Sequence, residues 1–134
     1  MLLGLAISGA GYSQETGIVP EDEVRLTGKT WTWIHALYTD GHKLAPKSPN
    51  KFTLTFKPDG TFSATTDCNR LSGRFTTTKD EISFSEIAAT RMFCEDSQES
   101  DFTALLKTAQ SYAFTPKGRL ILRLKQAAGS ATFD

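Results

Sequence analysis

The sequence predicts an α+β, mainly β fold: a small antiparallel, strongly curved sheet or barrel-like structure with one helix packed against it. Two observations support this prediction. Several short segments alternate apolar and polar residues with the period of a half-buried strand, and turn sequences such as Pro58-Asp59-Gly60 separate them. Only one segment repeats its apolar residues at helical spacing.

Length and charge narrow the class of protein. The 134 residues suit one domain with a single moderate core. Because 15 basic residues balance 15 acidic ones, no global field attracts nucleic acid or an anionic membrane, and we expect neither as a partner. We expect a monomer.

The chain is expected to divide into three parts. Residues 1–14 join a short apolar run to small residues, which is typical of a signal peptide, although the basic start of a complete signal is missing. The run is too short for a transmembrane segment. Residues 15–25 mix Gly, Pro and acidic residues without a period, and we interpret them as a linker before a domain at 26–134.

The first expected strand, residues 30–34, carries Trp31 and Trp33 on one face. Aromatic residues of this kind usually fill the core of a small β domain. The alternative is that they line an apolar ligand pocket. Gly and Pro residues after this strand indicate an extended loop.

Two hairpins are expected next. Residues 51–57, KFTLTFK, give the clearest alternation of apolar and polar residues in the chain. The turn that follows reverses the chain direction and leads into a second strand at 61–69. On that alternation Cys68 points toward the core. Residues 74–78 and 81–84 are expected to form the second hairpin.

The helix is expected over residues 97–110, where apolar residues follow the i, i+3, i+4, i+7 spacing at Phe102, Leu105, Leu106 and Ala109. Acidic residues gather at its start: Glu95, Asp96, Glu99 and Asp101. We interpret them as caps and helix-dipole partners, with Asp96 or Ser97 as the cap, rather than as a calcium site. A closing hairpin at 112–115 and 120–125 and an edge strand at 131–133 complete the expected fold.

In their order and spacing these pieces resemble the META domain family, which includes the HslJ-like heat-shock proteins. The resemblance covers most of 26–133 and depends on four motifs: Leu26-x-Gly28-x-x-Trp31, Asp59-Gly60, Cys68-Asn69-Arg70 with Ser72-Gly73, and Thr90-Arg91-Met92 with Cys94. It implies small envelope or secreted proteins linked to stress response, antibiotic resistance or motility, with no enzymatic activity generally attributed to them. Many members have Gly before the Cys-Asn pair, where this chain has Asp67.

The two cysteines, Cys68 and Cys94, allow three interpretations: a disulfide, two buried thiols, or half of a metal site. Structural zinc usually needs four Cys or His ligands, and only His35 and His42 remain, on opposite faces of a strand. We therefore expect no metal and no cofactor. Export favours oxidation, so the prediction is a Cys68–Cys94 disulfide.

Asn69, Arg70 and Arg91 flank the cysteines, and a disulfide would bring the two guanidinium groups within reach of each other. Paired arginines suit a carboxylate or phosphate, so the three residues are candidates for an anion or partner contact. The alternative is structural: Asn69 stabilises a turn, while the arginines form ion pairs with acids such as Asp67, Glu86 or Glu95.

The chain shows no complete catalytic constellation, such as a Gly-x-Ser-x-Gly elbow, and we expect a protein that is not an enzyme. The predicted function is that of an exported, periplasmic or secreted, interaction module of the bacterial cell envelope. Its partner would be a protein or envelope component, contacted through surfaces such as residues 35–50. The alternative is a small-ligand carrier with an apolar cavity near Trp31 and Trp33.

Overall fold

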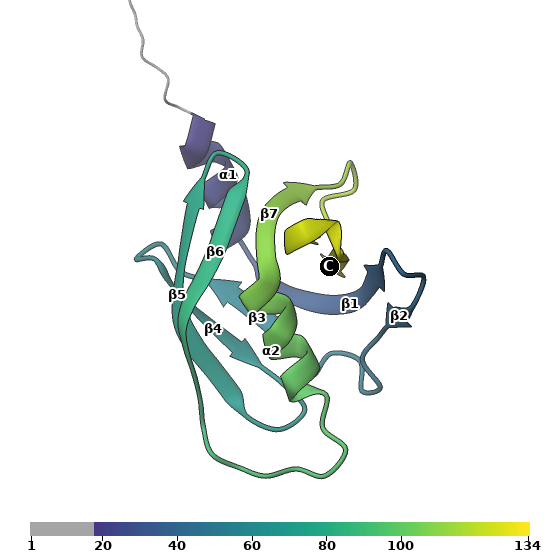
Figure 1. Ribbon diagram of the computed structural model, residues 1–134. Coiled ribbons are helices and arrows are strands. Elements are labelled where there is room, and N and C mark those ends of the chain that lie inside the picture. The colour runs from purple at the N-terminus through teal and green to yellow at the C-terminus, as the bar shows by residue number, and fades with distance from the viewer. Residues whose placement is uncertain (1–17) are drawn as a thin grey trace, which may run out of the picture.

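The structure is a computed structural model that describes residues 18–134. One antiparallel sheet of nine strands runs in the order β2-β1-β3-β4-β5-β6-β7-β8-β9, and pairing of β1 with β9 closes it into a ring. The strands are β1 (Thr30–Tyr38), β2 (Lys43–Leu44), β3 (Thr53–Phe56), β4 (Thr61–Thr65), β5 (Arg70–Thr78), β6 (Glu81–Ala89), β7 (Ala109–Phe114), β8 (Leu120–Leu124) and β9 (Gly129–Phe133). The helices are α1 (Ile18–Thr27) and α2 (Glu99–Thr108), and a short 3-10 turn, η2 (Lys125–Ala127), follows β8. The predicted fold class is confirmed (Figure 1).

The hairpin of β3 and β4 shows how sequence alternation produces the sheet. Leu54 and Phe56 point inward and are buried, while the threonines of both strands point outward. Thr53 and Thr65 face each other across the pair, with their hydroxyl oxygens 2.7 Å apart. At the turn, the Asp59 carboxylate accepts a hydrogen bond of 2.9 Å from the backbone N–H of Thr61.

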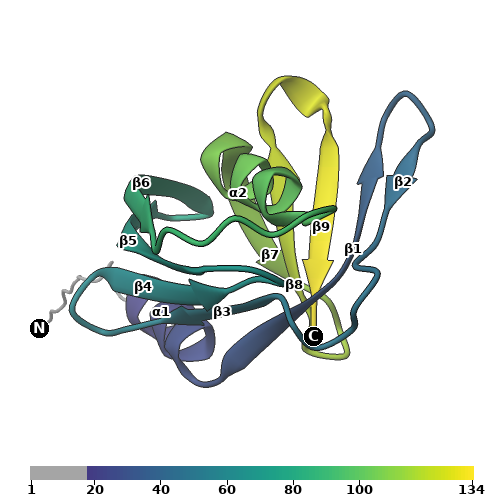
Figure 2. The same cartoon turned by 90° about the horizontal axis from the view of Figure 1, so that it is seen from below.

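The sheet curves around α2, which lies between β6 and β9 (Figure 2). Three apolar residues of α2, Phe102, Leu105 and Leu106, are buried. The ring of Phe102 lies 5.3 Å from that of Phe52 and 5.8 Å from that of Trp33, measured between centroids. This aromatic cluster anchors the helix, and with it the start of α2, to the interior of the barrel.

Strand β6 leaves a gap in the barrel wall on its β7 side. β6 pairs with β5 along most of its length, but its register with β7 consists of a single pair, Glu81 with Ser111. Beyond that pair the two strands separate, and α2 makes contact with β6. The chain crosses from the end of β6 to the start of α2 in the loop of residues 90–98, which lies at the end of the barrel away from α1 (Figure 1).

Helix α1 differs from the prediction, because a linker was expected over 15–25. From Ile18 onward the chain is helical; the expected signal remnant at 1–14 and residues 15–17 lie outside the described residues. The last turn of α1 attaches to the barrel: Leu26 is fully buried, and its carbonyl accepts a 2.9 Å hydrogen bond from Trp31 Nε1. The Arg25 guanidinium stacks 3.9 Å from the centre of the Phe114 ring. The residues that hold α1, Trp31 and Phe114, lie outside the helix, so the segment's own sequence gives little indication of it.

Two further expectations need correction. The first strand continues past Ile34 to Tyr38, so part of the expected loop is strand. The second strand ends at Thr65. The alternation holds through the buried Thr66, but Cys68 is half-buried rather than directed into the core. The cause is local: the Thr66 hydroxyl oxygen accepts hydrogen bonds from the backbone N–H groups of Cys68 (3.0 Å) and Asn69 (2.9 Å), which turns the chain.

Gly73 in β5 lies where neighbouring atoms leave no room for a side chain. The register of β5 with β6 shifts between Ser72 and Arg74, and a Cβ on Gly73 would lie 2.7 Å from both the Phe62 ring and the Ser85 carbonyl oxygen. Gly73→Ala is therefore expected to lower the free energy of unfolding by about 2 kcal/mol. Urea unfolding measures this, with exposed Ser72→Ala as the matched control. Equal midpoints for the two variants would contradict the steric argument.

Candidate functional site

A disulfide joins the turn between β4 and β5 to the loop of residues 90–98, which we call the β6–α2 loop. The sulfur atoms of Cys68 and Cys94 are 2.07 Å apart, and their Cα atoms are 5.8 Å apart. The predicted disulfide is present in the structure. It fixes the middle of a loop that otherwise runs between β6 and α2 without regular pairing.

Asn69 fastens the same loop by hydrogen bonds and is only 7% exposed. Its Oδ1 accepts from the backbone N–H of Met92 (2.8 Å) and from the Thr90 hydroxyl (2.9 Å). Its Nδ2 donates to the Met92 carbonyl (3.0 Å) and to Glu99 Oε2 (3.1 Å). One side-chain amide thus uses its full hydrogen-bonding capacity, and both backbone groups of Met92 are bound to it.

Glu99, the first residue of α2, completes this network. Its Oε1 accepts from the Thr66 hydroxyl (2.6 Å) and from the backbone N–H of Asn69 (2.8 Å). The turn between β4 and β5, the β6–α2 loop and the start of α2 are therefore joined through one carboxylate and one amide. We call the side chains of Asn69 and Glu99 the polar clasp.

The start of α2 is capped partly from outside its own segment. The N-cap is Gln98 rather than the expected Asp96 or Ser97, and its side chain makes no capping bond. The Ser97 hydroxyl, one residue earlier, accepts from the backbone N–H of Glu99 (3.0 Å). Asp67 supplies the second acceptor, taking hydrogen bonds from the Ser97 hydroxyl (2.6 Å) and the backbone N–H of Gln98 (2.9 Å). Asp96 makes no such bond within the described chain. The acidic residue at position 67 thus has a structural role at a helix N-terminus.

The structure brings Arg70 and Arg91 to the same end of the barrel. The backbone of Arg70 exchanges hydrogen bonds with Thr90, the residue before Arg91, and both arginine side chains are exposed. Over residues 18–134 the ion pairs join His42 to Asp40 and Arg119 to Asp134. The expected ion pairs of the two arginines with nearby acids are therefore absent from the described chain, and their guanidinium groups face solvent.

Two apolar side chains at this end are strongly exposed, and their sequence pattern does not predict it. Met92 is 61% exposed and Phe93 is 93% exposed. We call these two residues the apolar tip. The backbone on both sides of Phe93 is fixed, since Asn69 holds Met92 and the disulfide holds Cys94. Residues in a loop follow no apolar–polar alternation, so the exposure of these two side chains could not be predicted from the sequence.

The candidate pocket residues are buried: Trp31 is 2% exposed and Trp33 is 1% exposed. The Trp31 ring packs against Phe114, and the Trp33 ring packs edge-on against Phe52 at 5.3 Å between centroids. Trp33 Nε1 is buried without a hydrogen-bond partner among the described residues. A surface hollow of about 510 Å³ borders Trp33 and the prolines Pro46 and Pro49. Trp31 does not line it, and the aromatic packing gives no support to a ligand cavity between the two indoles.

Residues 35–50 form the end of β1, the short strand β2 and the following loop. The rings of Tyr38 and His42 are stacked with centroids 4.1 Å apart. Hydrogen bonds from the backbone N–H and the ring of His42 hold the pKa of the Asp40 carboxyl below its usual range. The Gln98 side chain ties the loop to α2 by bonding the backbone of Lys47 and Ala45. These contacts account for the turn without a ligand.

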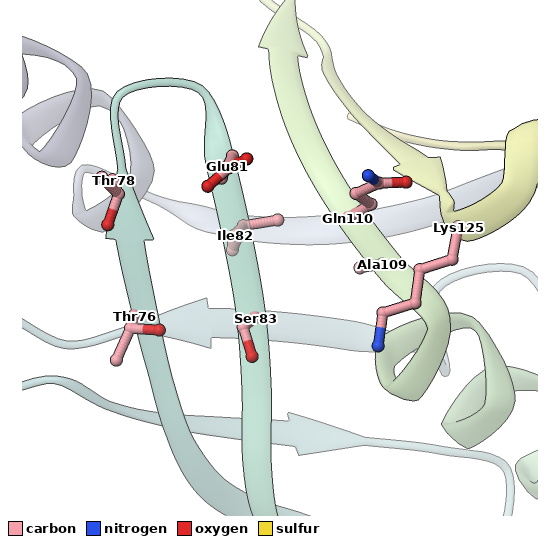
Figure 3. A pocket seen from close by; sticks show the side chains of 8 residues that line it. All are labelled: Thr76, Thr78, Glu81, Ile82, Ser83, Ala109, Gln110 and Lys125. Carbon is pink, nitrogen blue, oxygen red and sulfur yellow. The ribbon is translucent and has the colours of Figure 1, made fainter.

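A hollow of about 260 Å³ lies beside the gap between β6 and β7 (Figure 3). Ile82 and Ser83 of β6 line one side, Ala109 and Gln110 of β7 line the other, and the Lys125 side chain lies along the β7 side. Residues 18–134 contain no cluster of three His, Cys, Asp or Glu residues suited to a metal ion. In this part of the chain no helix combines the length and apolar character needed to cross a bilayer.

The fold and site together define a small β barrel whose one end is closed by a helix and a disulfide-fastened loop. The chain belongs to the META domain family, whose model matches residues 24–133. This family membership confirms the resemblance seen in the sequence motifs. No curated protein matches the chain.

Solved structures share the fold at low sequence identity. An NMR structure of a protein from Burkholderia xenovorans is 22% identical, with 94% of each chain covered and a TM-score of 0.69. A crystal structure of a DUF4847 family protein from Bacteroides vulgatus is 18% identical, covering 84% of this chain and 95% of that one, with a TM-score of 0.61. At such identities the likeness establishes the fold alone.

Proposed function

We propose that this protein is a non-catalytic interaction module of the bacterial cell envelope, and that the apolar tip is its contact surface. The observation that carries the proposal is the 93% exposure of Phe93 on a loop whose flanking residues are both fastened to the barrel. Arg70 and Arg91 flank the tip with unpaired guanidinium groups. Aromatic and arginine side chains dominate the energetic centres of protein interfaces.

The fastened backbone favours binding for an energetic reason. A flexible loop loses conformational freedom when a partner immobilises it, and this loss weakens the complex. Here the disulfide and the polar clasp have already restricted the backbone around the tip. The burial of Phe93 by a partner then contributes about 2 kcal/mol that ordering of the loop does not offset.

Two further observations support export as the setting. Disulfides persist in oxidising compartments such as the periplasm, and a META domain with a Cys68–Cys94 bridge is compatible with that location. The composition of residues 1–14 also suits a signal peptide. We place the protein in the periplasm or outside the cell, and we take a link to stress response from the family resemblance.

Site-specific photocrosslinking in living cells tests the proposal. A photoreactive phenylalanine analogue at position 93 is expected to give adducts with a second protein, because a bound partner covers that side chain. The matched control carries the same analogue at Lys117, which is exposed in the turn between β7 and β8. Adducts at position 93 and not at 117 support the proposal. Equal adducts at both positions, or none at either, would rule out the apolar tip as a dedicated contact surface.

A further inference from the structure

The β6–α2 loop carries its charges in a definite order around the apolar tip. Arg91 comes directly before the tip, while Glu95 and Asp96 follow the bridged Cys94. Arg70 adds a second positive charge on the side of Arg91, because its backbone is hydrogen-bonded to Thr90. The loop is therefore basic on one side of Phe93 and acidic on the other.

These charges are exposed and have no partner within the molecule. Neither the arginines nor Glu95 and Asp96 take part in the ion pairs found over residues 18–134. Arg91, Glu95 and Asp96 are all exposed in the same short stretch as the tip. Two charges of each sign are thus available to a partner at the same place as the apolar surface.

A loop with this basic, apolar, acidic order can pair with an identical loop. When two copies meet about a two-fold axis perpendicular to this loop, the equivalent loops run antiparallel, and each residue i faces residue j while j faces i. An axis beside Phe93 places the two Phe93 rings together. It also sets Arg91 of each copy opposite Glu95 of the other. Both ends of the contact then pair opposite charges, and the centre buries apolar surface.

We propose that the apolar tip binds a second copy of this chain, forming a two-fold dimer through the β6–α2 loop. The inference rests on the proposed role of the tip as a contact surface, and it names one partner for that surface. It replaces the monomer expected from composition, since the exposed apolar pair becomes visible only in the structure.

The dimer is weak and reversible, because the contact is small. Stable interfaces bury about 1,200–2,000 Å² in total, and residues 91–96 of one loop offer considerably less. Association is expected at protein concentrations on the order of 100 μM. It weakens as salt is added, since the charge pairs lie at a solvent-exposed rim.

Charge reversal tests the dimer on the purified full chain, with sedimentation velocity as the measurement. The sedimentation coefficient of the parent is expected to rise with protein concentration. Arg91→Glu and Glu95→Arg, each alone, place like charges opposite each other and weaken association about tenfold or more. Mixing the two variants restores it, because a mixed dimer again pairs opposite charges at both ends of the contact.

Two controls separate this effect from general changes in charge or folding. Phe93→Ser removes the apolar centre and is expected to abolish association while leaving thermal unfolding unchanged, since the side chain is exposed. Lys117→Glu alters charge to the same extent as Arg91→Glu at a distant turn and leaves association unchanged. A parent that stays monomeric up to about 1 mM, or reversed variants that do not rescue each other, would overturn the dimer.

The outcomes also separate the dimer from the proposed function. If the purified chain does not self-associate but position 93 still crosslinks to another protein in cells, the dimer is wrong and the interaction module stands. If neither association nor site-specific adducts occur, both proposals fail.

Discussion

Replacing Asn69 by alanine is expected to lower the free energy of unfolding by about 4 kcal/mol. The substitution removes four hydrogen bonds of a side chain that is 7% exposed. It also removes the partner of Glu99 Oε2 and of the Met92 N–H and carbonyl, in contacts that are partly buried. Each buried polar group left unpaired costs about 1–3 kcal/mol, so the loss exceeds that of an ordinary surface hydrogen bond several-fold.

Urea unfolding measures the global effect, and hydrogen exchange measures the local one. The amide of Met92 should exchange much faster in the variant, because its acceptor is the Asn69 side chain. Gln110→Ala is the matched control, since Gln110 is an exposed amide whose side chain makes no hydrogen bond within the described residues. A loss below about 1 kcal/mol for Asn69→Ala would mean that the polar clasp does not hold the loop.

The barrel itself could be predicted because its strands follow local rules. In residues 51–57, inward Phe and Leu alternate with outward Thr and Lys, and each position is decided by its neighbours in sequence. The helix follows the same logic, although its observed limits, Glu99–Thr108, are shorter than the expected 97–110. The cysteines could be paired because they are the only two in the chain.

The polar clasp could not be predicted in the same way. Asn69 and Glu99 are far apart in sequence, and each has a sufficient local explanation, a turn residue in one case and a first-turn helix acid in the other. Their contact arises only when the sheet curls and α2 enters the barrel. The same holds for Asp67, which caps a helix in a distant segment. Long-range polar contacts of this kind leave no periodic trace in the sequence.

The exposure of Phe93 was missed for the opposite reason. Aromatic residues in small β domains are mostly buried, and the other eight phenylalanines of the chain lie inside the barrel or pack against its core. Only the hydrogen bonds to Met92 and the bridge at Cys94 reveal that the chain turns this one outward and holds it there. A side chain exposed by a fastened backbone is better evidence for a contact surface than composition alone.

Removing the disulfide with the double substitution Cys68→Ser and Cys94→Ser is expected to lower the free energy of unfolding by about 3.5 kcal/mol. The bridge joins residues 26 positions apart. Closing a loop of this length lowers the conformational entropy of the unfolded chain, and this loss corresponds to the expected change in free energy. Urea unfolding of parent and variant measures the loss. Reductant should produce a similar loss in the parent and none in the variant, which separates the bridge from any effect of the serine side chains.

The bridge and the polar clasp act on the same loop, and their effects should therefore not add. Without the disulfide the β6–α2 loop has more freedom, so the hydrogen bonds of Asn69 must order a longer flexible segment and contribute less. The triple variant, with Asn69→Ala added, is expected to lose less stability than the sum of the separate changes. Strict additivity would show that the two devices hold independent parts of the chain, and the apolar tip would then depend on each of them separately.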